Sequence, residues 1–276
     1  MKIAVCFSGN LRHFKKCYYT FKECVLDASD HDFDVFTRTW DSRIQHFKEH
    51  FEDDGTLEEM VSLYKPKLIE SEIYNEEKRE ELYKATGMDF FQKKIQALTN
   101  CEQRGFHYGD KCTICGGKYL HSFIGQIYNI WKANSLRKKY EEENNVKYDL
   151  VIRTRFDNHF FEKLTDDKIQ KMTNGSVWIP YGYDSYKKFG GGPNDQMAIG
   201  TGKVMDVYSK MYENTLKIFE QNKKCVSPHK MIEDIFMENN IPIERFWLKY
   251  VLFKRLDAYN KRTKNITDEE YKNLRL

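Results

Sequence analysis

The sequence predicts an α/β fold in which helices flank a mixed, mostly parallel sheet. Two short apolar runs rich in β-branched residues, Lys2–Phe7 and Leu150–Ile152, are typical of strands buried on both faces. An amphipathic helical pattern follows the first run and another precedes the second. We expect a single domain over residues 1–254, with a cysteine-bearing insertion at about 75–118 and a charged tail at 255–276.

Composition narrows the class of protein. The chain has 276 residues, of which 40% are hydrophobic and 15% aromatic, so it can build a large core and is not disordered. Its 45 basic and 42 acidic residues nearly cancel, which gives no indication of nucleic-acid binding. No run approaches the roughly 20 apolar residues of a membrane span, and no secretion signal precedes the first strand. Seven cysteines, an odd number, favour reduced thiols and a cytoplasmic location.

The chain opens with a strand, a turn and a helix. Lys2–Phe7 is the strand, Ser8 and Gly9 begin the turn, and a helical apolar stripe follows at Phe14, Cys17, Tyr18, Phe21 and Val25. Gly9 would let a ligand approach the backbone, and Arg12 would be available to a phosphate group. Alternatively, Gly9 serves only the turn.

Two further strands are expected before the insertion. Phe33–Trp40 ends in polar residues and an indole, and we expect Trp40 to be a core residue and not a stacking surface. A polar helix is expected at about 45–63. Lys67–Glu70 then forms the third strand, with Pro66 at its start, where proline is tolerated.

The insertion carries a cysteine pair with metal-ligand spacing. Cys112 and Cys115 are separated by two residues, as in a zinc knuckle, and Cys101 and His107 would complete a tetrahedral set for a structural Zn²⁺. The alternative is that these thiols are unbound in an insertion loop. A closed four-ligand site leaves no position for catalysis, so this feature would only stabilise the loop.

A helix at 120–140 leads into the most informative strand. Gln126 and Asn134 lie on or beside its apolar face; each side chain either faces the ligand pocket or satisfies backbone groups, and we favour the second for both. The strand Leu150–Ile152 is followed by three charged residues: Arg153, Arg155 and Asp157. Ligands of open α/β sheets bind beyond the carboxyl ends of strands. The two guanidiniums suit a diphosphate and Asp157 suits a divalent cation. The alternative is an arginine-aspartate salt bridge.

A second informative stretch follows a short helix at 166–172 and a strand at Val177–Pro180. It is a loop with Gly191 and Gly192, before a short strand at 197–199. The loop holds three polar residues: Asn194, Asp195 and Gln196. Such side chains, set between a loop and a rigid strand, are suited to positioning a hydroxyl group and taking its proton. The alternative is an ordinary turn.

The end of the chain is helical and then extended. One helix is expected to span the apolar stripe from Val204 to Ile218, and a second to begin with Ser227 as N-cap and Pro228 in the first helical position. We interpret His229, in the first turn of this helix, as a surface or capping residue; the alternative is a metal or phosphate ligand. Ile241–Phe253 is expected to be a strand pair or extended segment.

Four segments together resemble a known family: Ser8–Arg12, Asp34–Trp40, Tyr148–Asp157 and Asn194–Gln196. In this ordered set the chain resembles glycosyltransferases with a GT-A-like, Rossmann-related fold, which include WavE-like proteins of polysaccharide synthesis and relatives in microbes and large viruses. The resemblance covers roughly residues 1–250, apart from the cysteine-bearing insertion.

The resemblance implies transfer of a sugar from a nucleotide-sugar donor to a hydroxyl acceptor on a glycan or polysaccharide. Such enzymes carry an Asp-x-Asp motif that binds a divalent metal and the donor diphosphate. The matching segment here is Arg155-Phe156-Asp157, so Asp157 would be the sole contact for Mn²⁺ or Mg²⁺.

The same resemblance assigns roles to the other segments. Donor contacts would come from Ser8, Gly9, Arg12, Arg153, Arg155 and Asp157. Acceptor contacts would come from Gly191, Gly192, Asn194 and Gln196. Asp195 would be the general base of an inverting displacement. The alternatives are another phosphate-handling enzyme, such as a nucleotidyltransferase, and a non-catalytic binding module stapled by zinc.

Overall fold

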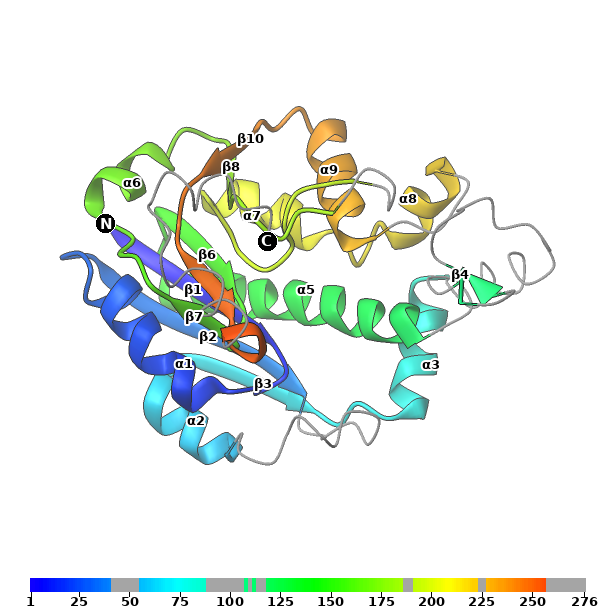
Figure 1. The fold of residues 1–276 in the computed structure, drawn as a ribbon, viewed down its shortest axis with the longest axis horizontal. Helices are drawn as coiled ribbons and strands as arrows, with labels where there is room; N and C mark the ends of the chain where they lie inside the picture. Colours follow the sequence, from blue (N-terminus) through cyan, green and yellow to red (C-terminus); the bar gives the residue numbers. More distant parts are fainter. Residues whose placement is uncertain are drawn as a thin grey trace.

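The computed structural model describes residues 1–40, 55–87, 107–108, 111–112, 118–185, 191–222 and 227–256. A seven-stranded sheet runs through its centre (Figure 1). Across the sheet the strands lie in the order β10 (Ile243–Phe246), β8 (Val177–Pro180), β9 (Ala198–Gly200), β6 (Leu150–Thr154), β1 (Lys2–Gly9), β2 (Asp32–Trp40) and β3 (Leu68–Glu72). Only the pairings of β9 are antiparallel. The predicted mixed, mostly parallel sheet is therefore confirmed, and its arrangement is consistent with a GT-A-like domain.

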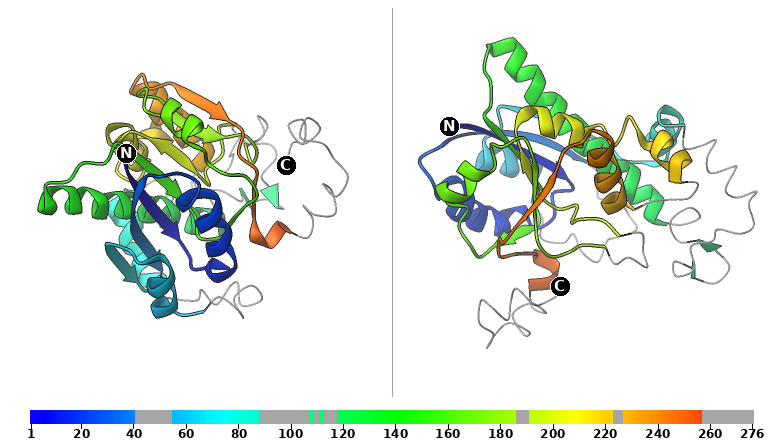
Figure 2. Two further views of the ribbon diagram at one scale, coloured as in Figure 1. Left: turned by 90° about the vertical axis from the view of Figure 1, so that its left-hand side faces the viewer. Right: turned by 90° about the horizontal axis from the view of Figure 1, so that it is seen from above.

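Helices cover both faces of the sheet (Figure 2). One face carries α3 (Glu76–Ala85), α5 (Lys118–Asn144), α7 (Gly202–Ser209), α8 (Thr215–Asn222) and α9 (Pro228–Glu238). The other carries α1 (Phe14–Phe21), α2 (Leu57–Tyr64) and α6 (Asp166–Lys171). Each layer buries its own hydrophobic cluster against the sheet, so the strands between them have two apolar faces.

Side chains of strand β1 pack against both layers of helices. Ala4 and Cys6 belong to the cluster under α5, whereas Ile3, Val5 and Phe7 belong to the cluster under α1 and α2. Successive strand side chains point to opposite faces, so a continuous apolar run fits a doubly covered strand. Burial raises the pKa of the Cys6 thiol to about 12. With Cys17 and Cys24 it is one of three buried free thiols in the described part of the chain, as expected for reduced cysteines.

The reversed direction of β9 places its start beside the ends of the parallel strands. We call the side of the sheet where β1, β2, β6, β8 and β10 end the carboxyl edge. Because β9 is antiparallel to β6 and β8, the residues before Ala198 lie at this same edge. A two-stranded sheet of β7 (Asn158–Phe160) and β11 (Tyr250–Leu252) follows β6 there.

The structure corrects several predicted elements. The helix expected from Val204 to Ile218 is two helices, since α7 ends at Ser209 and α8 begins at Thr215. The Thr215 hydroxyl donates back to the carbonyl oxygens of Met211 and Tyr212, at 2.9 Å each, which closes the intervening turn. The extended end of the chain forms β10 and β11, which pair with β8 and β7 and not with each other.

Other differences concern helix ends. The first helix continues past α1 into a π-helical turn at Lys22–Leu26, which the periodicity does not predict. Of the helix expected at about 45–63, residues 45–54 lie outside the described part. The described part begins with Thr56, whose side chain forms a capping box with Glu59 ahead of α2.

The cysteine-bearing insertion is described only in part. Cys101 and Cys115 lie outside the described residues. His107 and Cys112 face each other in a small hairpin of β4 (His107–Tyr108) and β5 (Lys111–Cys112), for which the backbone alone is described. The structural zinc therefore stays a prediction. In the described residues, no helix has both the length and the apolar character that a membrane crossing requires.

Candidate functional site

Arg153 links three segments at the carboxyl edge. Its side chain leaves β6 on the same face of the sheet as Ser8 of β1, and only 2% of the residue is exposed. The Arg153 Nε donates to Ser8 Oγ at 3.0 Å, and Nη1 donates to the carbonyl oxygen of Asp195 in the loop before β9. Both acceptors are neutral, and no described carboxylate forms an ion pair with Arg153. Because its hydrogen bonds go only to neutral groups, this buried guanidinium can also bind an anionic ligand.

Arg155 and Asp157 form the salt bridge that the sequence leaves open. Arg155 donates from Nε to Asp157 Oδ1 at 2.7 Å and from Nη2 to Oδ2 at 2.8 Å. Burial alone would raise the pKa of Asp157, but the charge and hydrogen bonds of Arg155, with the charge of Arg12, hold it below its ordinary value. The carboxylate is therefore ionised at neutral pH and fixed in orientation.

Asp195 is an ionised carboxylate held by two other elements. Gln126 of α5 donates from Nε2 to Asp195 Oδ2 at 2.8 Å, and His229 Nε2 lies 3.6 Å from Oδ1. Burial would raise the pKa of Asp195, but the electrostatic interaction with His229, the hydrogen bond from Gln126 and the charges of Arg155 and Arg153 bring it below its ordinary value. Gln126 therefore serves a side chain of the site, and the prediction that it satisfies backbone groups is wrong.

His229 is a site residue whose contact with Asp195 the sequence did not predict. It lies in the first turn of α9, which Ser227 caps and Pro228 begins, as predicted. Its Nε2 also lies 3.2 Å from the carbonyl oxygen of Tyr183. Both neighbours of this nitrogen are acceptors, so they favour the tautomer with the proton on Nε2. The capping interpretation of His229 fails because nothing in the local sequence indicates that α9 points its first turn at Asp195.

Two glycines prepare the loop before β9. Gly192 has a φ of +102°, and a Cβ there would lie 2.2 Å from the carbonyl oxygen of His229, so only glycine lets the loop pack on the first turn of α9. Gly191 also has a positive φ, of +71°, but the space beside it is open, as it is beside Gly9 at the end of β1. The backbone at Gly9 and Gly191 is therefore accessible, whereas the backbone at Gly192 packs against α9.

The side-chain amides of Asn194 and Gln196, on either side of Asp195, differ in whether their hydrogen-bonding groups have partners. Asn194 is fully buried, donates to Pro180 O at 3.2 Å and Tyr250 Oη at 2.5 Å, and accepts from the Gln196 backbone at 2.7 Å. Its side chain therefore holds the loop in shape. The buried Oε1 of Gln196 and Oδ1 of Asn158 have no hydrogen-bond partner among the described residues. Such acceptors are costly when left without a donor, and ligand hydroxyl groups could supply one.

Two other predicted positions belong to the interior. Trp40 is 6% exposed and stacks on Tyr128 with ring centroids 5.6 Å apart, so it is a core residue as expected. Asn134 donates to the side chains of Asp206 and Ser209, at 2.9 and 3.0 Å, and accepts from Arg137. The prediction that Asn134 satisfies backbone groups is therefore wrong.

The site offers one carboxylate to a divalent cation. Among the described residues, no three His, Cys, Asp or Glu side chains gather closely enough to cage a metal ion. Each oxygen of Asp157 accepts one hydrogen bond from Arg155 and keeps a second lone pair. This donor set fits Mg²⁺ or Mn²⁺ only in the mode where one carboxylate and the ligand's own phosphates hold the ion.

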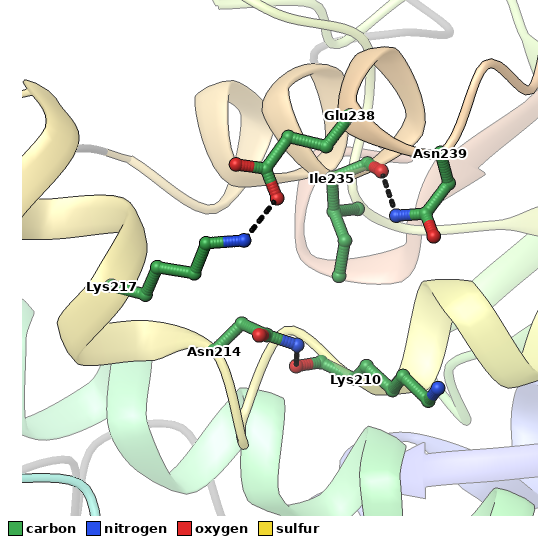
Figure 3. A pocket seen from close by; sticks show the side chains of 6 residues that line it. All are labelled: Lys210, Asn214, Lys217, Ile235, Glu238 and Asn239. Carbon is green, nitrogen blue, oxygen red and sulfur yellow. Dashed lines mark hydrogen bonds and ion pairs between the residues drawn. The ribbon is translucent and has the colours of Figure 1, made fainter.

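A hollow of about 460 Å³ lies apart from these residues, between the α7–α8 connection and α9 (Figure 3). Its lining residues are Lys210, Asn214, Lys217, Ile235, Glu238 and Asn239. Lys217 pairs with Glu238 at 3.0 Å, and Asn239 donates to the Ile235 carbonyl at 2.7 Å. Because most of its polar groups bind one another, we assign no chemistry to it.

Comparisons with known proteins add little about chemistry. No family model matches the sequence, and no curated protein matches it. Among solved structures, the chain is similar to mouse xyloside xylosyltransferase 1 in its apo form. The two share 9% sequence identity and a TM-score of 0.41, over 89% of this chain and 84% of that one. No family model supports the specific resemblance to WavE-like proteins, and the function is argued from the site alone.

Proposed function

We propose that this protein is a glycosyltransferase that moves a sugar from a nucleotide-sugar donor to a hydroxyl group of an acceptor. The observation that carries the proposal is Arg153, a buried guanidinium whose hydrogen bonds go to neutral groups, next to an ionised carboxylate at Asp195. With Arg155 and Arg12 it gives this region more positive than negative charge, which suits a diphosphate leaving group, and the carboxylate beside it suits a hydroxyl nucleophile.

The donor diphosphate would bind between the turn after β1 and the end of β6. The accessible backbone at Gly9, the Arg12 side chain and the guanidiniums of Arg153 and Arg155 line this region. Ser8 and Asp157 hold two of these arginines in place through hydrogen bonds of 2.7–3.0 Å. Charge that is already oriented stabilises the departing diphosphate without reorganisation during the reaction.

The acceptor hydroxyl would lose its proton to Asp195. In an inverting displacement, the acceptor oxygen bonds to the anomeric carbon while the bond from that carbon to the diphosphate oxygen breaks. Gln126 and His229 keep Asp195 ionised and oriented until the hydroxyl arrives. The open backbone at Gly191 is available to the acceptor substrate, while Asn194 and Gly192 shape the loop.

A divalent cation would have a limited part. Asp157 would hold Mn²⁺ or Mg²⁺ together with the donor phosphates, and the ion would add to the neutralisation of the diphosphate. The arginines already supply positive charge at the same place, so we expect the ion to strengthen donor binding without being required for it.

The test is a thermal-shift screen against nucleoside diphosphates and their sugars, each with and without Mn²⁺. A ligand at about 100 times its dissociation constant stabilises the native state by about 2.7 kcal/mol. We expect one nucleotide family to stabilise the protein, and Asp195→Asn to keep that shift while losing about 10²–10⁴-fold in turnover. The control is Arg79→Ala on α3, which removes a partly exposed ion pair with Glu76. This variant should keep both the nucleotide shift and the turnover of the wild type.

Product analysis completes this test. A glycosyltransferase releases a nucleoside diphosphate, whereas a nucleotidyltransferase releases pyrophosphate from a triphosphate. Absence of stabilisation by every nucleotide, or full turnover in Asp195→Asn, would contradict the proposal.

A further inference from the structure

The turn after β8 has an unusual backbone. Gly182 and Tyr183 both adopt left-handed conformations, with φ of +90° and +57°. A positive φ is costly for a residue with a side chain, such as Tyr183, and it persists where the surroundings require it. In this turn the carbonyl oxygen of Tyr183 lies 3.2 Å from His229 Nε2, and the next residue, Asp184, meets the loop that precedes β9. The turn therefore contacts two elements of the candidate site.

Asp184 binds the backbone of that loop. Its Oδ1 accepts from the Asn194 nitrogen at 2.9 Å, one residue before Asp195. A carboxylate acceptor makes such a bond stronger than a neutral oxygen would. The loop has two further bonds close to Asp195: Gln196 N donates to Asn194 Oδ1 at 2.7 Å, and the Asp195 carbonyl oxygen accepts from Arg153. The backbone is thus bonded before, at and after Asp195.

Arg245 of β10 holds Asp184 in turn. Its Nη2 donates to the two Asp184 oxygens at 2.7 and 3.1 Å. It also donates to the carbonyl oxygens of Ile179 and Pro180, at 3.0 and 2.8 Å, which ties it to the end of β8. The Asp184 side chain is 39% exposed, so this ion pair contributes little to the stability of the fold. Its place against the loop indicates that it orients the loop instead.

The direction of the Asp195 carboxylate depends on the loop. Gln126 of α5 contacts one of its oxygens and His229 of α9 lies near the other, so a shift of the loop disturbs both contacts. A displacement of about 1 Å in a reacting group can lower a rate by about 10²-fold. A residue that fixes the loop therefore acts on the reaction without touching the substrate.

We propose that Asp184 is a positioning residue for Asp195, which it orients through the backbone of Asn194. The inference rests on the proposed function and deepens it, because it names a residue that sets the geometry of the general base. Both Asp184 oxygens accept from Arg245, so Asp184 is itself oriented from β10.

The first measurement is amide hydrogen exchange, which needs no ligand. Asp184→Ala should raise the exchange rate of the Asn194 amide by about tenfold or more, and Asp184→Asn, which keeps an acceptor oxygen, should stay close to the wild type. Asp149→Ala is the matched control, because the Asp149 carboxylate accepts from the Lys2 nitrogen at 2.8 Å where β1 and β6 begin. It should leave Asn194 unchanged. All three variants should melt within about 4 °C of the wild type.

The second measurement is the release of nucleoside diphosphate from the nucleotide sugar, with water as the accepting hydroxyl. The water oxygen bonds to the anomeric carbon, the bond from that carbon to the diphosphate oxygen breaks, and Asp195 takes the proton. Asp184→Ala should lower kcat about tenfold and leave KM for the nucleotide sugar within about twofold, and Asp184→Asn should recover most of kcat. Asp149→Ala should keep the wild-type values.

A double variant tests whether Asp184 acts through Asp195. When Asp195→Asn is already present, adding Asp184→Ala should change the residual kcat by less than about twofold, because the group that Asp184 orients no longer takes the proton. A residue that served only the fold would lower kcat by the same factor with or without Asp195.

The two proposals fail in different ways. If no nucleotide stabilises the wild type, or no nucleotide sugar is cleaved, the proposed function fails. If the wild type cleaves a nucleotide sugar but Asp184→Ala keeps full turnover, or lowers it equally in the Asp195→Asn background, the positioning role is wrong. An Asn194 exchange rate that Asp184→Ala leaves unchanged would overturn it as well.

Discussion

Two buried arginines of this protein, Arg137 and Arg153, have opposite surroundings. Each is 2% exposed. Arg137 on α5 donates to Glu141 at 2.7 Å, to Asn134 at 3.0 and 3.2 Å, and to Asp206 of α7, so two carboxylates balance its charge. Arg153 donates to a hydroxyl and a backbone carbonyl. Arg137 is hydrogen-bonded directly to its counterions, as in a structural ion pair, whereas Arg153 interacts with the charge of Asp195 without a hydrogen bond to its carboxylate and so can bind a further anion.

The contrast extends to the neighbours of each arginine. Around Arg137 the polar groups satisfy one another and join α5 to α7. Around Arg153, the Gln196 and Asn158 side chains keep acceptors without a partner among the described residues, and the backbone at Gly9 is open. The first cluster is complete in the protein alone, and the second is not.

The largest effect on folding is expected from Arg137→Met. The change leaves Asp206 and Glu141 without their buried partner, which should lower the free energy of unfolding by about 3–5 kcal/mol, measured by urea denaturation. Lys139→Met is the control, because its pair with Glu143 is 3.8 Å long and more than half exposed on both sides. The control should change stability by no more than about 0.5 kcal/mol. Equal effects would mean that the Arg137 cluster is not structural.

A smaller effect, dependent on pH, is expected from Asp157→Asn. The folded-state pKa of Asp157 is lowered, so its ionised form contributes stability above the unfolded pKa of about 4 and loses it as the pH falls through the folded value. The variant leaves Arg155, whose side chain is 23% exposed, without its ionised partner, at a cost of about 1.5–3 kcal/mol near neutral pH. Urea denaturation from pH 7 to pH 3 should show the difference from wild type shrinking on the acid side. A difference that grows as the pH falls would show that the pKa is raised.

The smallest effect on folding is expected from Arg153→Met. Two hydrogen bonds are lost, but a buried charge that no carboxylate binds directly is removed as well, so the free energy of unfolding should change by less than about 2 kcal/mol. Thermal stabilisation by the nucleotide should nevertheless disappear. The same measurements on the folded fraction of Arg137→Met should show a normal nucleotide shift. A nucleotide response in Arg153→Met equal to that of the wild type would show that the two arginines do not differ in the way described.

The fold was predictable because its strands are locally marked. Lys2–Phe7 and Leu150–Ile152 are apolar at consecutive positions, and the residues after them are polar or charged, so their ends can be located. The direction of β9 was not predictable, because Ala198 and Ile199 are apolar whichever way the strand runs. A strand of three residues is too short for its sequence to indicate which strands it pairs with.

The site was predictable only to the level of residue type. Arg137 and Arg153 look alike in sequence, and they differ because Asp206 lies 69 residues beyond Arg137 in the chain but bonds to it in space. His229 and Gln126 come from two helices, α9 and α5, and both meet at Asp195. A sequence pattern reports the face of a helix, whereas partner choice depends on how the helices pack.

The reversed strand β9 has a consequence for how specificity can change. Since β9 enters the sheet at the carboxyl edge, its preceding loop, with Asp195 and the link from Asn194 to Asp184, belongs to a chain segment separate from β1 and β6. Arg153 bonds to this loop through the backbone carbonyl of Asp195, so side-chain substitutions between β8 and β9 can keep that bond. Under the proposed function, donor and acceptor preference would then be separately evolvable, and chimaeras exchanged at the ends of these strands are a natural engineering route.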